Sequence, residues 1–141
     1  MSQLLDSPNA LTTPIVGESD LLRIRSALRA EAQNVGMGLT AATKLITAGS
    51  ELARNIVRYA VDGRGEVTIE RIRDGDRHGV RVVFRDAGPG IADIDEAMRD
   101  GFSTAGSLGL GLPGTRRLVD EFAIDSEPGR GTTVVIAQWS R

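Results

Sequence analysis

The sequence predicts an α+β domain, a two-layer α/β sandwich in which helices cover one face of a mixed, mainly antiparallel sheet. Two helical segments follow one another near the N-terminus, and most strands come as neighbouring pairs joined by turns. This order argues against a Rossmann fold, in which strands and helices alternate. A chain of 141 residues, of which 40% are hydrophobic and 26% charged, has the size and composition of one domain. We therefore expect a flexible N-terminus over residues 1–10 and a single domain over residues 11–141.

The N-terminal half is expected to begin with a short strand and two helices. Residues 11–16 suit a strand at a sheet edge, because their proline has no N–H group to donate. A helix over residues 19–34, capped by Ser19 or Asp20, follows from apolar residues spaced three and four apart. The same spacing predicts a longer helix over residues 40–60, with the threonine at its start as the cap.

The hydrophobic period changes from helical to strand-like after residue 65. EVTIERIR (66–73) and GVRVVFRD (79–86) are rich in β-branched residues and are separated by a turn composition, which predicts an antiparallel hairpin. A helix is expected over residues 112–122. AIDSE (123–127) and TTVVIAQW (132–139), joined by a PGRG turn, predict a second hairpin.

The composition narrows the functional classes. The formal net charge is −2 and the basic residues are scattered, so we expect no nucleic-acid binding. The chain has no cysteine, which excludes disulfides, a cysteine nucleophile and thiolate zinc sites. No apolar run approaches the roughly 20 residues of a membrane-spanning helix. We therefore expect no membrane association and a cytoplasmic protein.

The first segment that could carry a chemical function is ELARNI, residues 51–56. Glu51 and Asn55 are four residues apart and share one face of the predicted helix, at the edge of its apolar stripe. A carboxylate and an amide oxygen placed there suit the activation of a hydroxyl group and the binding of Mg²⁺, which prefers hard oxygen ligands. The alternative interpretation is the solvated flank of an ordinary helix.

The second segment is DAGPGI, residues 86–91, which follows a predicted buried strand. Asp86, followed by Gly88 and Gly90, would form a concave corner with an acceptor directed inward. Such a carboxylate can accept a hydrogen bond from an exocyclic amine like that of adenine. Aspartate, glycine and proline are also common turn residues, so an ordinary turn is the alternative.

The third segment is GFSTAGSLGLGLPGT, residues 101–115, which has five glycines and no lysine or arginine. Gly106, Gly109 and Gly111 precede a predicted helix, and a helix N-terminus offers N–H groups and partial positive charge to an anion. The segment therefore suits phosphate binding without a cation of its own. The alternative is a flexible loop without a ligand.

The order of these three segments resembles the GHKL ATP-binding fold of gyrase, Hsp90, histidine kinases and MutL. ELARNI resembles the N box of that family, DAGPG its G1 box and GLGLG its G2 box, and Gly131-Thr132 resembles its strand threonine. The resemblance covers about residues 12–140. SELARNI, DAGPGI and DGFSTAGSLGLGLPGTRRLVDEF are most similar to RsbT-type serine/threonine switch kinases, and less closely to RsbW and SpoIIAB anti-sigma kinases.

This resemblance implies a bacterial partner-switching kinase that uses ATP and Mg²⁺. Its expected substrates are STAS-domain antagonist proteins, including those of the stressosome scaffold. Once released, the kinase is expected to bind and activate a PP2C-type phosphatase. The alternative function is an anti-sigma factor or a sequestering, ATP-binding regulator with little kinase activity.

The resemblance also implies roles for individual residues. Glu51 would be the general base, Asn55 would bind Mg²⁺, Asp86 would accept the adenine amine, and Thr132 would reach adenine through water. Residues 92–108 would form a mobile lid. The residues implied to contact the nucleotide are Asn55, Asp86, Gly88, Gly90, Ile91, Thr104, Gly106, Ser107, Leu108, Gly109, Leu110, Gly111, Leu112 and Thr132.

The glycine-rich segment leaves the charge of the phosphates to be balanced by other groups. Mg²⁺, backbone N–H groups and the helix N-terminus are expected to supply most of this balance, with Arg116 or Arg117 as a further source. Four hydroxyl groups are candidates for additional hydrogen-bond donors to the phosphates: Ser103, Thr104, Ser107 and Thr115.

Overall fold

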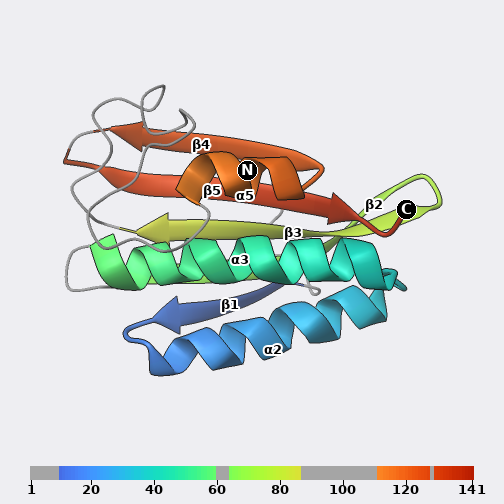
Figure 1. The fold of residues 1–141 in the computed structure, drawn as a ribbon, viewed down its shortest axis with the longest axis horizontal. Helices are drawn as coiled ribbons and strands as arrows, with labels where there is room; N and C mark the ends of the chain where they lie inside the picture. Colours follow the sequence, from blue (N-terminus) through green and yellow to red (C-terminus); the bar gives the residue numbers. More distant parts are fainter. Residues whose placement is uncertain (1–9, 60–63, 87–110, 128) are drawn as a thin grey trace.

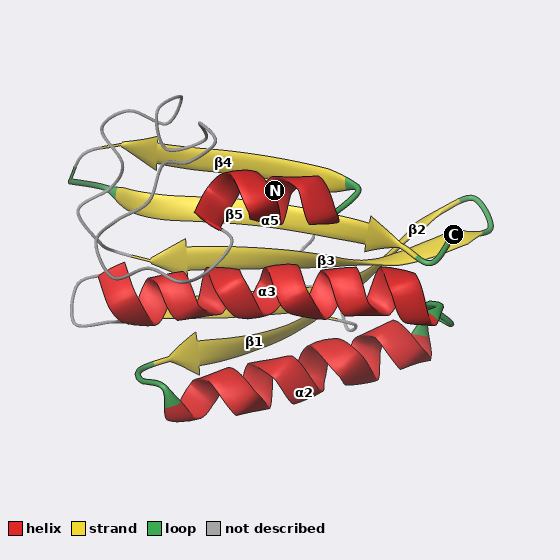
Figure 2. Cartoon of the chain, in the orientation of Figure 1, coloured by secondary structure: helices red, strands yellow, loops and turns green. Residues whose placement is uncertain are grey.

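A computed structural model describes residues 10–59, 64–86, 111–127 and 129–141, and it has the predicted two-layer architecture. One layer is a five-stranded sheet, and the described helices lie on one of its faces (Figures 1 and 2). The elements are β1 (Ala10–Ile15), α2 (Ser19–Asn34), α3 (Leu39–Tyr59), β2 (Gly65–Asp74), β3 (Arg77–Asp86), α5 (Gly111–Leu118), β4 (Glu121–Glu127) and β5 (Gly131–Trp139).

The strands are ordered β1-β2-β3-β5-β4, and every pair of neighbours among the described strands is antiparallel. The α+β sandwich is confirmed, but the expected parallel component of the sheet is absent from the described strands. The reason lies in the connections. β2 and β3 form one hairpin and β4 and β5 another, and β5 joins the two hairpins through its antiparallel ladder with β3.

The hydrophobic core lies between the sheet and the helices. Alternate residues of the central strands point toward the helices, as the pairs Val67–Phe84 and Phe84–Val134 illustrate. The buried residues of this core include Ile24, Leu28, Leu45, Leu52, Ile56, Val67, Ile69, Val82, Phe84, Val134 and Ile136. The apolar stripes predicted for α2 and α3 therefore face the sheet, and the polar edge of α3 remains at the surface.

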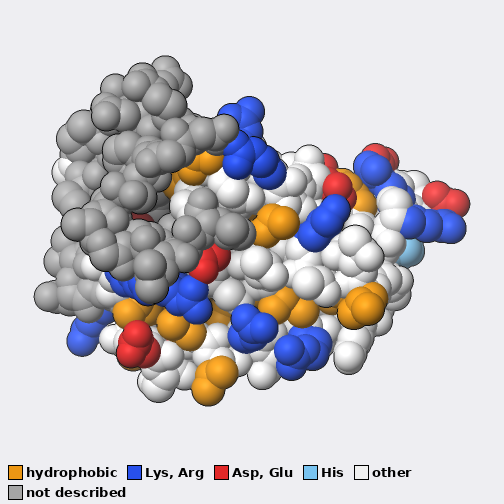
Figure 3. Space-filling view, in the orientation of Figure 1, with side chains coloured by type: hydrophobic (Ala, Val, Ile, Leu, Met, Phe, Trp, Pro, Cys, Tyr) orange, Lys and Arg blue, Asp and Glu red, His pale blue; other side chains and the backbone are white. Residues whose placement is uncertain are grey.

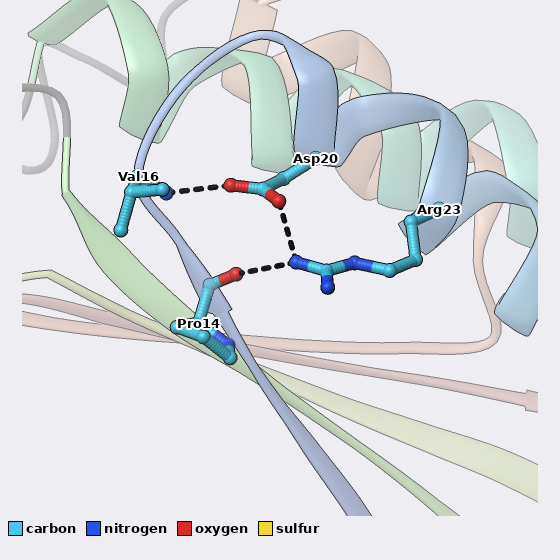
Figure 4. Close-up of polar contacts among 4 residues, drawn as sticks. All are labelled: Pro14, Val16, Asp20 and Arg23. Atoms are coloured by element: carbon cyan, nitrogen blue, oxygen red, sulfur yellow. Dashed lines mark hydrogen bonds and ion pairs between the residues drawn. The ribbon is translucent and has the colours of Figure 1, made fainter.

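The turn from β1 into α2 is fixed by Asp20, though not as the expected helix cap (Figure 4). The residue at the N-cap position is Glu18, which makes no side-chain capping bond, so the prediction of Ser19 or Asp20 was wrong. The Asp20 carboxylate instead accepts a hydrogen bond of 2.8 Å from the N–H of Val16. It also pairs with Arg23, whose guanidinium reaches back to the carbonyl oxygen of Pro14. A carboxylate in the first turn also suits the positive end of the helix dipole.

Most other boundaries differ from the predictions by a residue or two, and the start of α3 and the end of α5 change an interpretation. α3 begins at Leu39, so Thr40 lies inside the helix and is not its cap. The helix expected over residues 112–122 ends at Leu118, and β4 begins at Glu121. Hydrogen bonds to β5 explain this early end. The side-chain oxygen of Gln138 accepts from the N–H of Asp120 at 2.8 Å, and the Asp120 carboxylate accepts from the N–H of Trp139 at 2.9 Å.

Charged side chains are spread over the helical face of the molecule. Lys and Arg side chains are scattered along this face in Figure 3. None of the described helices is both long enough and apolar enough to cross a lipid bilayer.

An ion pair between α2 and β2 gives the fold one pH-dependent contribution to stability. Arg71 donates to the Glu31 carboxylate at 2.8 Å, and this hydrogen bond lowers the pKa of Glu31 from its usual 4.5. A carboxylate with a lowered pKa stabilises the fold above its unfolded-state pKa, and this contribution disappears as the pH falls through the lowered value.

We expect Arg71→Met to lower the unfolding midpoint slightly at pH 7, because the pair is solvent-exposed. The difference from wild type should shrink steadily as the pH falls below 4.5, because Glu31 is protonated first in the unfolded chain and then, through its lowered pKa, in the folded chain. Urea unfolding of both proteins between pH 7 and pH 3 measures this. A difference that stays constant over the whole range would contradict the assignment to Glu31.

Candidate functional site

The elements that carry the described candidate residues begin or end on one side of the molecule. The C-terminal ends of α3 and β3, the start of β5 and the start of α5 all lie at the left in Figure 1. Glu51, Asn55, Asp86 and Thr132 belong to three of these elements, and Gly111 begins the fourth. Segments that are 80 residues apart in the sequence are therefore brought to a common edge of the sheet.

Asp86 and Thr132 lie side by side on neighbouring strands. They are directly opposite each other in the β3–β5 ladder, so their side chains share a face of the sheet. That face is the one toward the helices, because Asp86 lies two residues after the buried Phe84. Both are partly buried. The strand-end carboxylate predicted from DAGPGI thus lies between the sheet and the helical layer.

Thr132 has a second hydroxyl beside it. Ser126, its partner in the β4–β5 ladder, makes a hydroxyl–hydroxyl hydrogen bond of 2.8 Å with Thr132 and donates to the carbonyl oxygen of Gly131 at 3.1 Å. This contact fixes the rotamer of Thr132 next to Asp86. Ser126 carries no motif that would identify it from the sequence, and only the strand register reveals its place beside Thr132.

Gly65 allows α3 to approach the strand that carries Asp86. It is the ladder partner of Asp86 on β2. A Cβ atom at this position would lie 2.3 Å from the carbonyl oxygen of Arg85 and 2.9 Å from Cγ2 of Ile56. Because Ile56 follows Asn55 directly in α3, this close contact places the Glu51–Asn55 turn against the end of the β2–β3 pair.

We expect Gly65→Ala to destabilise the protein by about 1–3 kcal/mol, the usual cost of inserting an atom into a packed site. Because the strain falls on the strand end that holds Asp86, nucleotide affinity should fall as well. Thermal unfolding and titration with ATP measure the two effects. Gly17→Ala is the matched control, since a Cβ atom there would meet nothing within 4 Å. Equal behaviour of the two variants would show that the close approach at Gly65 is unimportant.

Glu51 and Asn55 lie on the predicted common face of α3. The intervening Leu52 and Ala53 are buried in the core, while Glu51 and Asn55 are partly buried. The Glu51 side chain is only 13% exposed and accepts a hydrogen bond of 2.6 Å from Nη1 of Arg54. A solvated helix flank would leave such a carboxylate far more exposed. This turn is therefore not the fully solvated helix flank of the alternative interpretation.

Asn55 fits the role of a magnesium ligand. Its amide makes no hydrogen bond with any other residue that the structure describes, and it lies one turn from Glu51. The described residues contain no group of three or more His, Cys, Asp or Glu side chains that would hold a metal without help. A single amide oxygen suits Mg²⁺ that is held jointly with phosphate oxygens and water.

The start of α5 is built on a backbone conformation that requires glycine. Gly111 has a φ of +70°, which side-chain-bearing residues rarely adopt. Thr115 is fully buried, and its hydroxyl donates to the carbonyl oxygen of Gly111 at 2.9 Å. Its proton is therefore already used within the helix, and the expectation that Thr115 donates to phosphates was wrong. Arg116 and Arg117 are exposed in the last turn of α5.

Much of the expected nucleotide site lies outside the described residues. The lid expected over residues 92–108 is among these segments, as are Ser103 and nine of the implied contact residues. Those nine are Gly88, Gly90, Ile91, Thr104, Gly106, Ser107, Leu108, Gly109 and Leu110. The described part of the site consists of Glu51, Asn55, Asp86, Gly111, Leu112 and Thr132.

Comparison of the sequence with known proteins indicates the same family as the motifs do. The pattern of the family described as histidine kinase-, DNA gyrase B- and HSP90-like ATPases matches residues 40–140. The serine/threonine-protein kinase RsbT of Bacillus subtilis (strain 168) is 44% identical over 127 residues, which are 90% of this chain and 94% of RsbT. The anti-sigma F factor of Geobacillus thermodenitrificans (strain NG80-2) is 37% identical over 100 residues, 67% of this chain and 66% of that factor.

Solved structures share the fold. The RsbU and RsbW domains of a Mycobacterium tuberculosis protein match with a TM-score of 0.63 and 22% identity, over 92% of this chain and 31% of that one. A chain of the SiaB–SiaC complex from Pseudomonas aeruginosa matches with a TM-score of 0.61 and 17% identity, over 97% of this chain and 94% of that one. At these identities the likeness concerns the fold alone.

Proposed function

Because this chain belongs to the family of histidine kinase-, DNA gyrase B- and HSP90-like ATPases, we propose that it binds ATP beside Asp86 and Thr132 and phosphorylates a partner protein. By relationship it is a serine/threonine protein kinase of the RsbT type, since 44% identity extends over 90% of the chain. That identity is the observation that carries the proposal. The pairing of Asp86 with Thr132 across the β3–β5 ladder supports it independently.

Asp86 is the proposed recognition element for the adenine base. Its carboxylate accepts the hydrogen bond of the exocyclic amine, and the partly buried position beside Thr132 limits competition from water. The Thr132 hydroxyl, held by Ser126, is placed to bind a water that bridges to the base. A charged acceptor in such a setting favours ATP over a nucleotide whose base carries a carbonyl at the same position.

Glu51 and Asn55 are the proposed groups that act on the reaction itself. Glu51 accepts the proton of the serine or threonine hydroxyl while the hydroxyl oxygen forms its bond to the γ-phosphorus. The bond from the γ-phosphorus to the bridging oxygen breaks, and ADP leaves with that electron pair. Mg²⁺ on the amide oxygen of Asn55 would supply positive charge next to the phosphates. The N-terminus of α5 adds N–H donors at the same end of the sheet.

The proposed partners are those of RsbT-type switch kinases. STAS-domain antagonist or scaffold proteins are the proposed substrates, and a PP2C-type phosphatase is the proposed target of the released kinase. The relationship to both RsbT and anti-sigma F factors supports a regulator that works by exchanging protein partners. The same relationship to anti-sigma F factors favours the second candidate function, a sequestering regulator with little transfer activity.

One experiment separates the two candidate functions. The purified chain is mixed with Mg²⁺, ATP labelled in the γ-phosphate, and a STAS-domain protein from the same genome. Label appearing on a serine or threonine of that protein supports the kinase. Stable complex formation and ATP binding with no transferred label would instead support the sequestering regulator.

A further inference from the structure

We infer that Arg54 is a positioning residue that holds the carboxylate of Glu51 in its reactive orientation. The inference rests on the proposed function, because it assigns Arg54 a task in phosphoryl transfer. It starts from the ion pair that Nη1 of Arg54 makes with Oε1 of Glu51 at 2.6 Å. The two residues are three apart on α3 and therefore adjacent on the helix surface.

This ion pair is less exposed than two of the other described ion pairs between residues three apart, and it resembles the Arg23–Asp20 pair, whose 10% exposed carboxylate is also held in place by its arginine. The Arg77–Asp74 pair joins side chains that are 44% and 75% exposed, and the Arg130–Glu127 pair joins side chains that are 79% and 60% exposed. Glu51 is only 13% exposed, and its arginine is 38% exposed. The carboxylate is thus largely withdrawn from solvent, while the side chain of its arginine partner is more exposed.

The ion pair with Arg54 determines which carboxylate oxygen of Glu51 is available to accept a proton. Arg54 is its sole hydrogen-bonding partner among the described residues, and that bond goes to Oε1. A charge-assisted bond of this length removes the rotational freedom of a side chain with three torsions. Oε2 is left as the atom that can accept a proton. A base aimed in this way is close to its reactive geometry before the substrate arrives, which is where positioning contributes most to rate.

A purely structural role predicts a different pattern of effects. Ion pairs between residues three apart on a helix contribute little to stability, and the guanidinium of Arg54 is itself partly exposed. Loss of Arg54 should therefore leave the fold and the nucleotide affinity almost unchanged, while the rate of transfer falls. An arginine needed only for packing would instead lower the unfolding midpoint in step with the rate.

The test compares Arg54→Met, Arg54→Lys and the control Arg29→Met, which removes an exposed arginine from α2. For each protein we measure the ATP dissociation constant, the thermal midpoint and the rate of transfer to the STAS-domain protein at saturating concentrations. We expect Arg54→Met to slow transfer by about 10- to 100-fold, the cost of a misplaced catalytic group. Lysine should restore part of the rate, because it keeps the charge but not the fork geometry. Arg29→Met should behave as wild type.

A second measurement does not depend on transfer. The order parameter of the Arg54 Nε–Hε group, measured by NMR, should report a restrained guanidinium in wild type and a mobile one in Glu51→Ala. Normal transfer by Arg54→Met, equal losses of rate and stability, or a mobile Arg54 in wild type would each overturn the inference. If the wild-type chain transfers no phosphate at all, the proposed function fails, and the role of Arg54 fails with it.

Discussion

Asp86→Asn is expected to abolish measurable ATP binding while the protein stays folded. The substitution removes the charge of the acceptor and offers an amide whose NH₂ group opposes the amine of adenine. Losing a charge-assisted hydrogen bond costs about 1.5–3 kcal/mol, and a mismatched buried donor costs about 1–3 kcal/mol more. At about 1.4 kcal/mol for each factor of ten, the dissociation constant should rise by roughly 60- to 20,000-fold. Isothermal titration with ATP and Mg²⁺ measures it.

The matched control for this prediction is Asp125→Asn. Asp125 lies at the same end of the sheet on β4, but it is exposed and one residue out of phase with Ser126, so it points away from the helices. It should bind ATP as wild type does. A third comparison uses GTP, whose base carries a carbonyl where adenine has its amine. Wild type should strongly prefer ATP, and an Asp86→Asn protein that binds ATP normally would remove Asp86 from base recognition.

The sequence predicted the elements of this fold well because most of them are locally determined. The 3.6-residue stripe of α3 and the β-branched runs of β2 and β3 each identify one element without knowledge of the rest. The end of α5 was different. Val119, Asp120 and Phe122 continue a plausible helical pattern. The helix nevertheless ends at Leu118, because the Asp120 N–H donates to Gln138 of β5 and the Asp120 carboxylate accepts from the N–H of Trp139. A contact between residues 18 or 19 apart in the sequence is invisible to a local pattern.

In the candidate site, too, some residues could be predicted from the local sequence and others could not. Glu51 and Asn55 could be paired from helical spacing, and Asp86 from its place at a strand end. Gly65 and Ser126 could not be found this way, since their relevance comes from the ladder that sets Gly65 opposite Asp86 and Ser126 opposite Thr132. The ion pair of Arg54 was within reach of the sequence, because an arginine three residues after a glutamate can contact it on a helix. The burial of the Glu51 side chain could not be predicted from the sequence.

Glu51→Gln is expected to separate binding from chemistry. Glutamine keeps the shape of the side chain and can still meet Arg54 through its amide oxygen, but it cannot accept the hydroxyl proton at neutral pH. ATP affinity should therefore stay within about twofold of wild type, while the transfer rate falls by about 10²- to 10⁴-fold, the usual contribution of a general base. Glu51→Ala should show the same separation. Single-turnover transfer and ATP titration on the same preparation measure both quantities, with the exposed Glu18→Gln as the control.

Combining this substitution with Arg54→Met tests whether the two side chains act as one unit. If Arg54 works only through Glu51, then Glu51→Gln/Arg54→Met should be no slower than Glu51→Gln alone, because the second change has nothing left to misplace. Losses that multiply would mean that Arg54 contacts the substrate or the phosphates independently. Transfer at the wild-type rate by Glu51→Gln would show that Glu51 is not the base. The hydroxyl would then be activated by a different group, and the ion pair with Arg54 would be a structural feature of α3.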